Sequence, residues 1–99
     1  MYEHTLFIGM NDKDTMKQEL TLDQYKERIS RVLGDCTIKE GATGYYTHDN
    51  GTKVIEKSLE VKKFGGTKRS IVACAKKLKQ ELNQESIILQ TTISKADFI

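Results

Sequence analysis

A turn signal between two strand-like segments constrains the fold of this 99-residue chain more than any other feature. Asn50-Gly51 follows the run Tyr45-Tyr46-Thr47 and precedes an alternating segment over 53–64. Asparagine and glycine tolerate the positive φ that both central residues of a type I′ turn require. We therefore expect a β-hairpin with a two-residue type I′ turn in the middle of the chain.

A strand and a helix are predicted before this hairpin. The apolar run within residues 3–9 is typical of a buried strand, and a polar loop follows it. Thr21 with Gln24 three residues later forms a capping box, so we expect a helix over 21–33. The second strand begins near Cys36, and the glycines within it, Gly41 and Gly44, predict a bulge or bend.

A strand, a helix and a further strand are predicted from residue 53 onward. Alternation over 53–64 places Ile55, Leu59 and Val61 on one face of the third strand. Thr67 is the expected cap of a helix over 68–82, which Asn83 ends in the left-handed conformation. An apolar run from residue 87 starts the fourth strand.

The order strand–helix–strand–strand–helix–strand is typical of the ferredoxin-like split β-α-β fold, an α+β fold. We expect one domain over 1–99, with a four-stranded antiparallel sheet and two helices on one of its faces. Right-handed crossovers place the first and third strands in the centre. The other sheet face is then open, and a homodimer through this face is a prediction.

The composition predicts a small core under a highly charged surface. Apolar residues make up 37% and charged residues 30% of the chain, with a net charge of +2. Residues 1–50 hold 6 Lys or Arg against 9 Asp or Glu, and residues 51–99 hold 10 against 5. A mixed solvated surface and a basic patch for an anionic partner both remain open.

The two cysteines and the N-terminus predict a cytoplasmic protein. Cys36 and Cys74 form no C-x-x-C motif, and we interpret both as half-buried free thiols in a reducing compartment. The N-terminal segment has no basic start and only a short apolar run, so we expect no signal peptide, and no stretch is long enough to span a membrane.

The run Gly65-Gly66-Thr67-Lys68-Arg69 is the candidate ligand site of the sequence. Glycines allow a ligand close to the backbone, and a helix N-terminus with two cations favours a phosphate or carboxylate. The run lacks the Walker A pattern. The alternative is a strand-to-helix turn in which the glycines serve only the backbone geometry.

A second candidate contact surface lies at the hairpin, where Tyr45, Tyr46 and His48 gather with Lys53. Aromatic and basic side chains together can stack and neutralise nucleic acid. The segment 54–61 has no aromatic residue and carries glutamates, which argues against recognition of the RNP type. We expect one of the adjacent tyrosines to pack on the core and the other to face solvent.

No residue pattern predicts a catalytic group, a metal site or a cofactor. Asp12 and Asp14 have D-x-D spacing, but the remaining ligands of a calcium loop are missing, so we interpret them as a solvated loop. His4 and His48, the only histidines, have no metal-ligand spacing with the cysteines.

Four short motifs resemble a family of small bacterial and prophage proteins that carries no established activity. The matching residues are Leu6-Phe7-Ile8-Gly9, Gly44-Tyr45-Tyr46, Glu56-Lys57-Ser58-Leu59-Glu60-Val61 and Gln84-Glu85-Ser86-Ile87-Ile88-Leu89. The family often has tryptophan in the hairpin, where this chain has tyrosine. The resemblance implies the ferredoxin-like layout and a microbial or phage origin.

Three functions follow as hypotheses. The first is a non-catalytic phage or mobile-element accessory protein that occupies a host protein or sequesters an anionic, nucleotide-like ligand. The second is a dimeric small-substrate enzyme with a cavity between sheet and helices, in which Tyr45, Tyr46 or His48 acts as acid or base. The third is nucleic-acid binding by the lysine-rich second helix.

Overall fold

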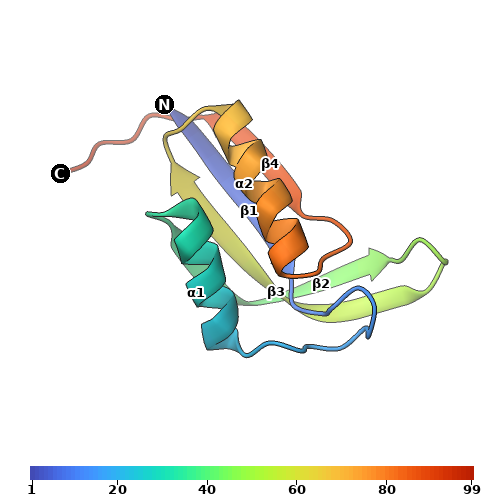
Figure 1. Ribbon diagram of the computed structural model, residues 1–99. Helices are drawn as coiled ribbons and strands as arrows, with labels where there is room; N and C mark the ends of the chain where they lie inside the picture. The colour runs from blue at the N-terminus through green and yellow to red at the C-terminus, as the bar shows by residue number, and fades with distance from the viewer.

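The chain folds into six elements in the predicted order, and the computed structural model describes all residues from 1 to 99. They are β1 (Tyr2–Gly9), α1 (Leu22–Leu33), β2 (Thr37–Thr47), β3 (Lys53–Phe64), α2 (Lys68–Glu81) and β4 (Ile88–Ile93). The strands form one antiparallel sheet in the order β2-β3-β1-β4 (Figure 1). This arrangement confirms the ferredoxin-like fold, with β1 and β3 in the centre.

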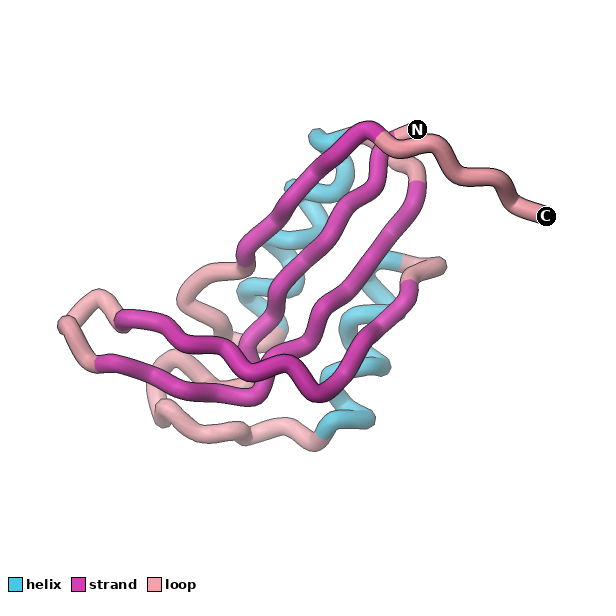
Figure 2. The backbone as a smooth tube through the Cα atoms, turned by 180° about the vertical axis from the view of Figure 1, so that it is seen from behind, coloured by secondary structure: helices cyan, strands magenta, loops and turns pink.

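Both helices cover one face of the sheet, and the other face is open. Figure 2 shows the open face, with the helices behind the strands. The core lies between the two layers and consists of residues with alternate spacing on the strands and helical spacing on α1 and α2. Its buried members are Leu6, Ile8, Met10, Tyr25, Ile29, Leu33, Leu59, Val61, Ile71, Leu78 and Leu82.

Local signals set the ends of both helices. The Thr21 side chain accepts a hydrogen bond from the Gln24 backbone N–H, and the Gln24 side chain accepts one from the Thr21 N–H, so the capping box is confirmed. The Thr67 side chain caps α2 by accepting a hydrogen bond from the Ser70 backbone N–H. Asn83 follows α2 with a φ of 47°, which confirms the left-handed end.

The predicted type I′ turn was wrong, although the hairpin itself is confirmed. Only Gly51 has a positive φ, of 85°, whereas both central residues of a type I′ turn require one. The Gly51 N–H donates to the carbonyl of His48, and the His48 N–H donates to the carbonyl of Thr52. The connection is therefore a three-residue loop in which a turn is followed by a left-handed glycine.

The β2–β3 hairpin extends beyond the rest of the sheet. β1 pairs with β3 only between Ser58 and Phe64, so residues 43–57 form a two-stranded projection, which we call the hairpin arm (Figure 2). The predicted irregularity of β2 is confirmed as a register shift between Lys39 and Ala42, where Gly41 has a φ of 86°. Because bulges bend a strand, this shift re-aims the arm relative to the sheet.

Two further expectations concern the cysteines and the membrane. Cys36 and Cys74 are both half-buried and unpaired, as predicted. Burial raises the pKa of the Cys36 thiol. The helices of this structure include none with the length and apolar character needed to cross a bilayer.

Candidate functional site

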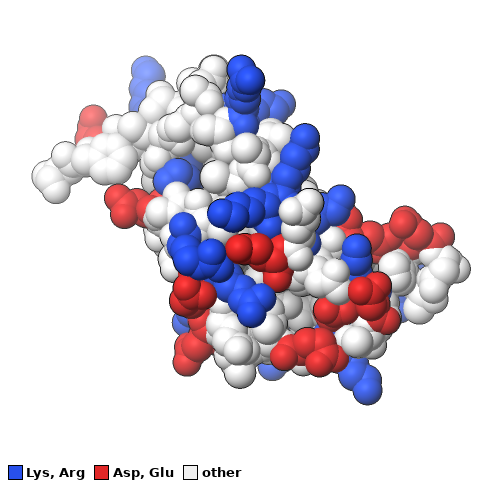
Figure 3. Space-filling view, in the orientation of Figure 1, with Lys and Arg blue, Asp and Glu red and all other residues white.

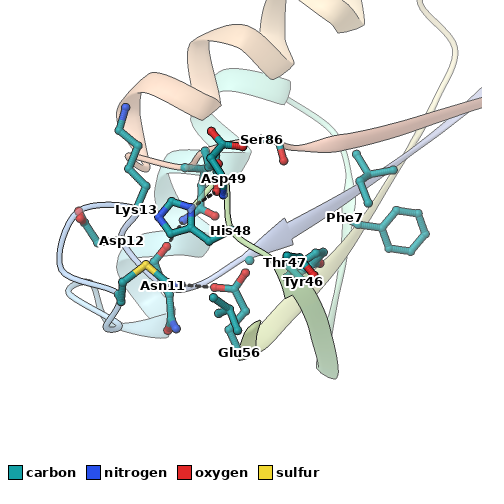
Figure 4. Close-up of a pocket in the computed structure, with 16 residues that line it drawn as sticks. Phe7, Asn11, Asp12, Lys13, Tyr46, Thr47, His48, Asp49, Glu56 and Ser86 are labelled. Atoms are coloured by element: carbon teal, nitrogen blue, oxygen red, sulfur yellow. Dashed lines mark hydrogen bonds and ion pairs between the residues drawn. The ribbon is translucent and has the colours of Figure 1, made fainter. Parts of the chain in front are cut away.

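A pocket of about 350 Å³ lies between the hairpin arm, the end of β1 and the α2–β4 loop. Its volume falls in the range of small-molecule sites, roughly 300–1,000 Å³. Figure 4 shows how side chains from these three segments face it. The lining residues are Phe7, Gly9, Asn11, Asp12, Lys13, Met16, Tyr46, Thr47, His48, Asp49, Val54, Glu56, Gln84, Glu85, Ser86 and Ile88.

Glu56 is a titratable side chain of the pocket whose pKa its surroundings shift. It lies in β3 on the open sheet face, and its Oε2 accepts a 2.8 Å hydrogen bond from the backbone N–H of Asn11 (Figure 4). Burial raises the pKa of its carboxyl group, against the lowering effect of that hydrogen bond. None of the ion pairs of the structure includes Glu56. The pocket therefore holds a half-buried carboxylate without a cationic partner.

The two adjacent tyrosines take different positions, but neither joins the core. Tyr46 lines the pocket, and its hydroxyl oxygen lies 3.3 Å from the hydroxyl of Ser58. Tyr45 points to the opposite side of the arm and is 74% exposed. The expectation that one of them packs on the core was wrong, because residues 43–57 project past the helices that form the core's second layer.

Glu85, in the α2–β4 loop, contacts the tip of the hairpin arm. Its Oε2 lies 2.6 Å from Nδ1 of His48. Its Oε1 accepts a 3.3 Å hydrogen bond from the backbone N–H of Asp49. These contacts join the arm to the loop beside the pocket. Lys53, at the start of β3, is exposed and does not line the pocket.

The D-x-D segment has a structural function that its sequence did not indicate. The Asn83 Nδ2 donates 2.9 Å hydrogen bonds to both Asp12 and Asp14. The hydrogen bond from Asn83 is the main cause that lowers the pKa of Asp12. Gln84 is buried and donates to the Asn11 carbonyl. Together these bonds fasten the β1–α1 loop to the end of α2, and so position one wall of the pocket.

The predicted site at Gly65–Arg69 lies elsewhere, at the start of α2. Gly65 and Gly66 have φ values of 83° and 81°, which favour glycine for backbone reasons alone. Nε2 of the buried His4 ring donates a 3.1 Å hydrogen bond to the Gly66 carbonyl. The Lys68 and Arg69 side chains are exposed. Anion binding at this turn stays a prediction.

The charges divide between two regions of the surface. In Figure 3 the Lys and Arg side chains gather over the two helices, and many Asp and Glu side chains gather toward the hairpin arm and the β1–α1 loop. The pocket follows this division, since Asp12, Asp49, Glu56 and Glu85 line it against Lys13 and His48. No three His, Cys, Asp or Glu side chains converge as a metal site requires.

Sequence reasoning missed Glu56 as a candidate. It appears in the sequence only as one acidic residue on the polar face of β3, like Glu60. The signal that distinguishes it is its cross-strand partner Gly44, together with Gly9 at the end of β1. That signal requires the strand register.

Comparison with solved structures finds the same fold in a phage protein. A phage SAM lyase in complex with S-methyl-5′-thioadenosine matches with a TM-score of 0.72 and 26% sequence identity, over 92% of this chain and 79% of the other. A phage SAM lyase in the apo state matches with a TM-score of 0.70 and 21% identity, over 92% and 78%. No protein-family model and no curated protein sequence matches the chain. The expected likeness to a small phage-related protein is therefore confirmed by this structural match.

Proposed function

We propose that this protein is an enzyme that binds S-adenosylmethionine (SAM) beside Glu56 and cleaves it. The observation that carries the proposal is the half-buried Glu56 carboxylate, which has no cationic partner. A buried charge is costly unless it is paired. The sulfonium of SAM is a permanent cation, so it supplies the partner that the pocket lacks.

The shape and composition of the pocket support the same ligand. Phe7 and Tyr46 offer aromatic faces on which a purine ring stacks. The excess of carboxylates over cations complements the net positive charge of SAM at neutral pH. The matched phage SAM lyase that is 26% identical was solved with S-methyl-5′-thioadenosine, which is the adenosine-bearing part of SAM.

A comparison of SAM with S-methyl-5′-thioadenosine identifies the bond to be broken. S-methyl-5′-thioadenosine keeps the methyl and adenosyl groups on sulfur, so its release from SAM breaks the bond between sulfur and Cγ of the amino acid chain. Sulfur leaves with the bonding electron pair. Cγ of the remaining four-carbon fragment then needs a new bond. On one route the carboxylate oxygen of the fragment attacks Cγ and closes a lactone. On the other route Cβ loses a proton, and its electron pair forms a Cβ–Cγ double bond.

Glu56 has a defined function on either route. In lactone formation no proton moves, and the carboxylate of Glu56 holds the sulfonium in position for attack. In alkene formation it also accepts the Cβ proton, for which a raised pKa is suited near neutral pH. Neither route consumes water or an external oxidant.

Release of S-methyl-5′-thioadenosine from SAM tests the proposal, with mass spectrometry to identify the four-carbon product. We expect Glu56→Gln to lower kcat/KM by about 10²–10⁴-fold, the range of a positioned acid–base or charged group. Glu60→Gln is the matched control, because Glu60 lies on the same strand face outside the pocket. SAM binding without cleavage by the wild-type protein would overturn catalysis and leave sequestration of the ligand.

This proposal places the enzyme hypothesis above the non-catalytic one, but with the pocket on the hairpin arm instead of between sheet and helices. The homodimer, a host-protein partner, nucleic-acid binding and a cytoplasmic location stay predictions. An anionic ligand at Gly65–Arg69 also stays a prediction. Isothermal titration with a nucleotide tests it, since replacing both Lys68 and Arg69 by alanine should abolish such binding.

A further inference from the structure

Two glycines flank Glu56 on the open sheet face, and backbone geometry explains neither of them. Gly9 ends β1, and Gly44 lies in β2 as the cross-strand partner of Glu56. Both are buried, and neither has a positive φ. Glycine weakens a strand because it packs no side chain and loses more backbone entropy than other residues. The two positions therefore need another explanation.

The space beside Gly9 is filled by the Glu56 side chain. A Cβ atom at position 9 would lie 2.5 Å from Cδ of Glu56 and closer still to its Oε1, whereas ordinary Cβ contacts begin at 3.4 Å. The Glu56 carboxylate lies over the bare backbone of Gly9, next to the Asn11 N–H that it accepts from. A side chain at position 9 would drive the carboxylate away from this N–H.

The space beside Gly44 is filled in the same way by the Tyr46 ring. A Cβ atom at position 44 would lie 2.8 Å from both Cζ and the hydroxyl oxygen of Tyr46. The ring therefore folds back along β2 over Gly44, and this brings its hydroxyl to Ser58. Two of the ionisable side chains of the pocket, Glu56 and Tyr46, thus occupy room that a glycine leaves.

We propose that Gly9 and Gly44 are positioning residues of the pocket, which hold Glu56 and Tyr46 in their inward conformations because they have no side chains. This inference deepens the proposed function and rests on it for its effect on SAM cleavage. The placement of the two side chains does not depend on the identity of the ligand, so it can be tested without one.

Gly9→Ala tests whether Gly9 positions Glu56. The measurement is an NMR titration that follows the carboxyl carbon of Glu56 in the ligand-free protein. The β conformation accepts alanine, so we expect the variant to fold with the carboxylate turned into solvent. The pKa of Glu56 should then fall toward its ordinary value, since burial is the main cause that raises it. An unchanged Glu56 titration in folded Gly9→Ala would overturn the proposal.

A comparison of Gly9→Ala in the presence and in the absence of the Glu56 side chain distinguishes positioning from general destabilisation of the strand. In Glu56→Ala the space over Gly9 is empty, so adding Gly9→Ala should leave Tm unchanged or raise it, because alanine suits a strand better than glycine. In the presence of Glu56 the same substitution should lower Tm. An equal loss of Tm in both backgrounds would show that Gly9 serves the backbone alone.

Kinetics with SAM then connect position and activity. Gly9→Ala should lower kcat/KM in the wild-type background and have no further effect in the Glu56→Gln background, because Gly9 acts through Glu56. For Gly44→Ala we expect the same dependence on Tyr46, with Tyr46→Ala as the background, because Tyr46→Phe keeps the ring that an added Cβ would meet. If wild-type protein does not cleave SAM, the proposed function fails, while the NMR and Tm results decide the positioning proposal independently.

Discussion

The backbone N–H of Asn11 donates a 2.8 Å hydrogen bond to Oε2 of Glu56, 45 residues later in the chain. Asn11 is positioned in turn by its carbonyl, which accepts from the buried Gln84 side chain. Asn11 thus connects three segments that are distant in the sequence, through its N–H to Glu56 and its carbonyl to Gln84. The geometry of the pocket depends on these long-range contacts, and the predictions below address them one at a time.

Glu56→Gln should stabilise the protein at neutral pH while it lowers activity. Because burial raises the pKa of Glu56 in the folded state, ionisation favours unfolding, and the free energy of unfolding falls as pH rises through the folded-state pKa. Below the ordinary pKa of about 4.3 both states are protonated and the effect disappears. Calorimetry should show a higher Tm for Glu56→Gln at pH 7.5 and no difference near pH 3. A lower Tm at pH 7.5 would contradict this account.

Tyr25 should make the protein sensitive to strong alkali. Its hydroxyl donates a 2.9 Å hydrogen bond to the Met10 carbonyl within the core, and burial raises the pKa of Tyr25 to about 12. The folded state keeps the proton longer than the unfolded state, so stability is full below about pH 10 and falls between pH 10 and 12. Denaturant titration should show this loss in the wild type and a smaller one in Tyr25→Phe.

At pH 7 the same Tyr25→Phe variant should be less stable than the wild type. The substitution leaves the buried Met10 carbonyl without its hydrogen bond, at a cost of about 1–3 kcal/mol. Equal stability of the two proteins at pH 7 would indicate that water replaces the hydroxyl.

Asn83 should contribute to stability through both its left-handed backbone conformation and its side-chain hydrogen bonds. Asn83→Ala loses the hydrogen bonds to Asp12 and Asp14 and places a Cβ-bearing residue without local hydrogen bonds at a φ of 47°. Asn83→Gly loses the same bonds but accepts that φ. Urea denaturation should show a cost of about 1–3 kcal/mol for alanine and a smaller one for glycine. A larger cost for glycine would indicate that the conformation contributes little.

Glu85→Ala should free the tip of the hairpin arm. Loss of the contacts to His48 and the Asp49 N–H removes the connection between the arm and the α2–β4 loop. Hydrogen exchange at the tip of the arm should become faster, with a change in global stability of about 1 kcal/mol or less, because the pair is partly exposed to solvent. Glu81→Ala is the control, because it breaks the ion pair with Arg31 on the helices. Equal exchange at the tip in both variants would exclude this function of Glu85.

The fold was predictable because its determinants are local. The capping box at Thr21 and Gln24, the alternation along β3 and the left-handed Asn83 each act within a few residues of the chain. The type of turn was not predictable from Asn50-Gly51, since this pair suits both a type I′ turn and a three-residue loop that ends in a left-handed glycine. The contacts of the tip with Glu85 are present only in the folded chain.

The pocket was only partly predictable. Tyr46 and His48 were chosen for their chemistry, and both line it, while Tyr45 and Lys53 do not. The sequence by itself determined the order of elements, the helix ends and the open sheet face, because hydrophobic period and capping are properties of short segments. Only the tertiary structure decided that Glu56 is half-buried and Glu60 lies outside the pocket. The physical reason is that burial and hydrogen bonding at Glu56 come from Gly9, at the end of β1, and from the Asn11 N–H in the loop that follows.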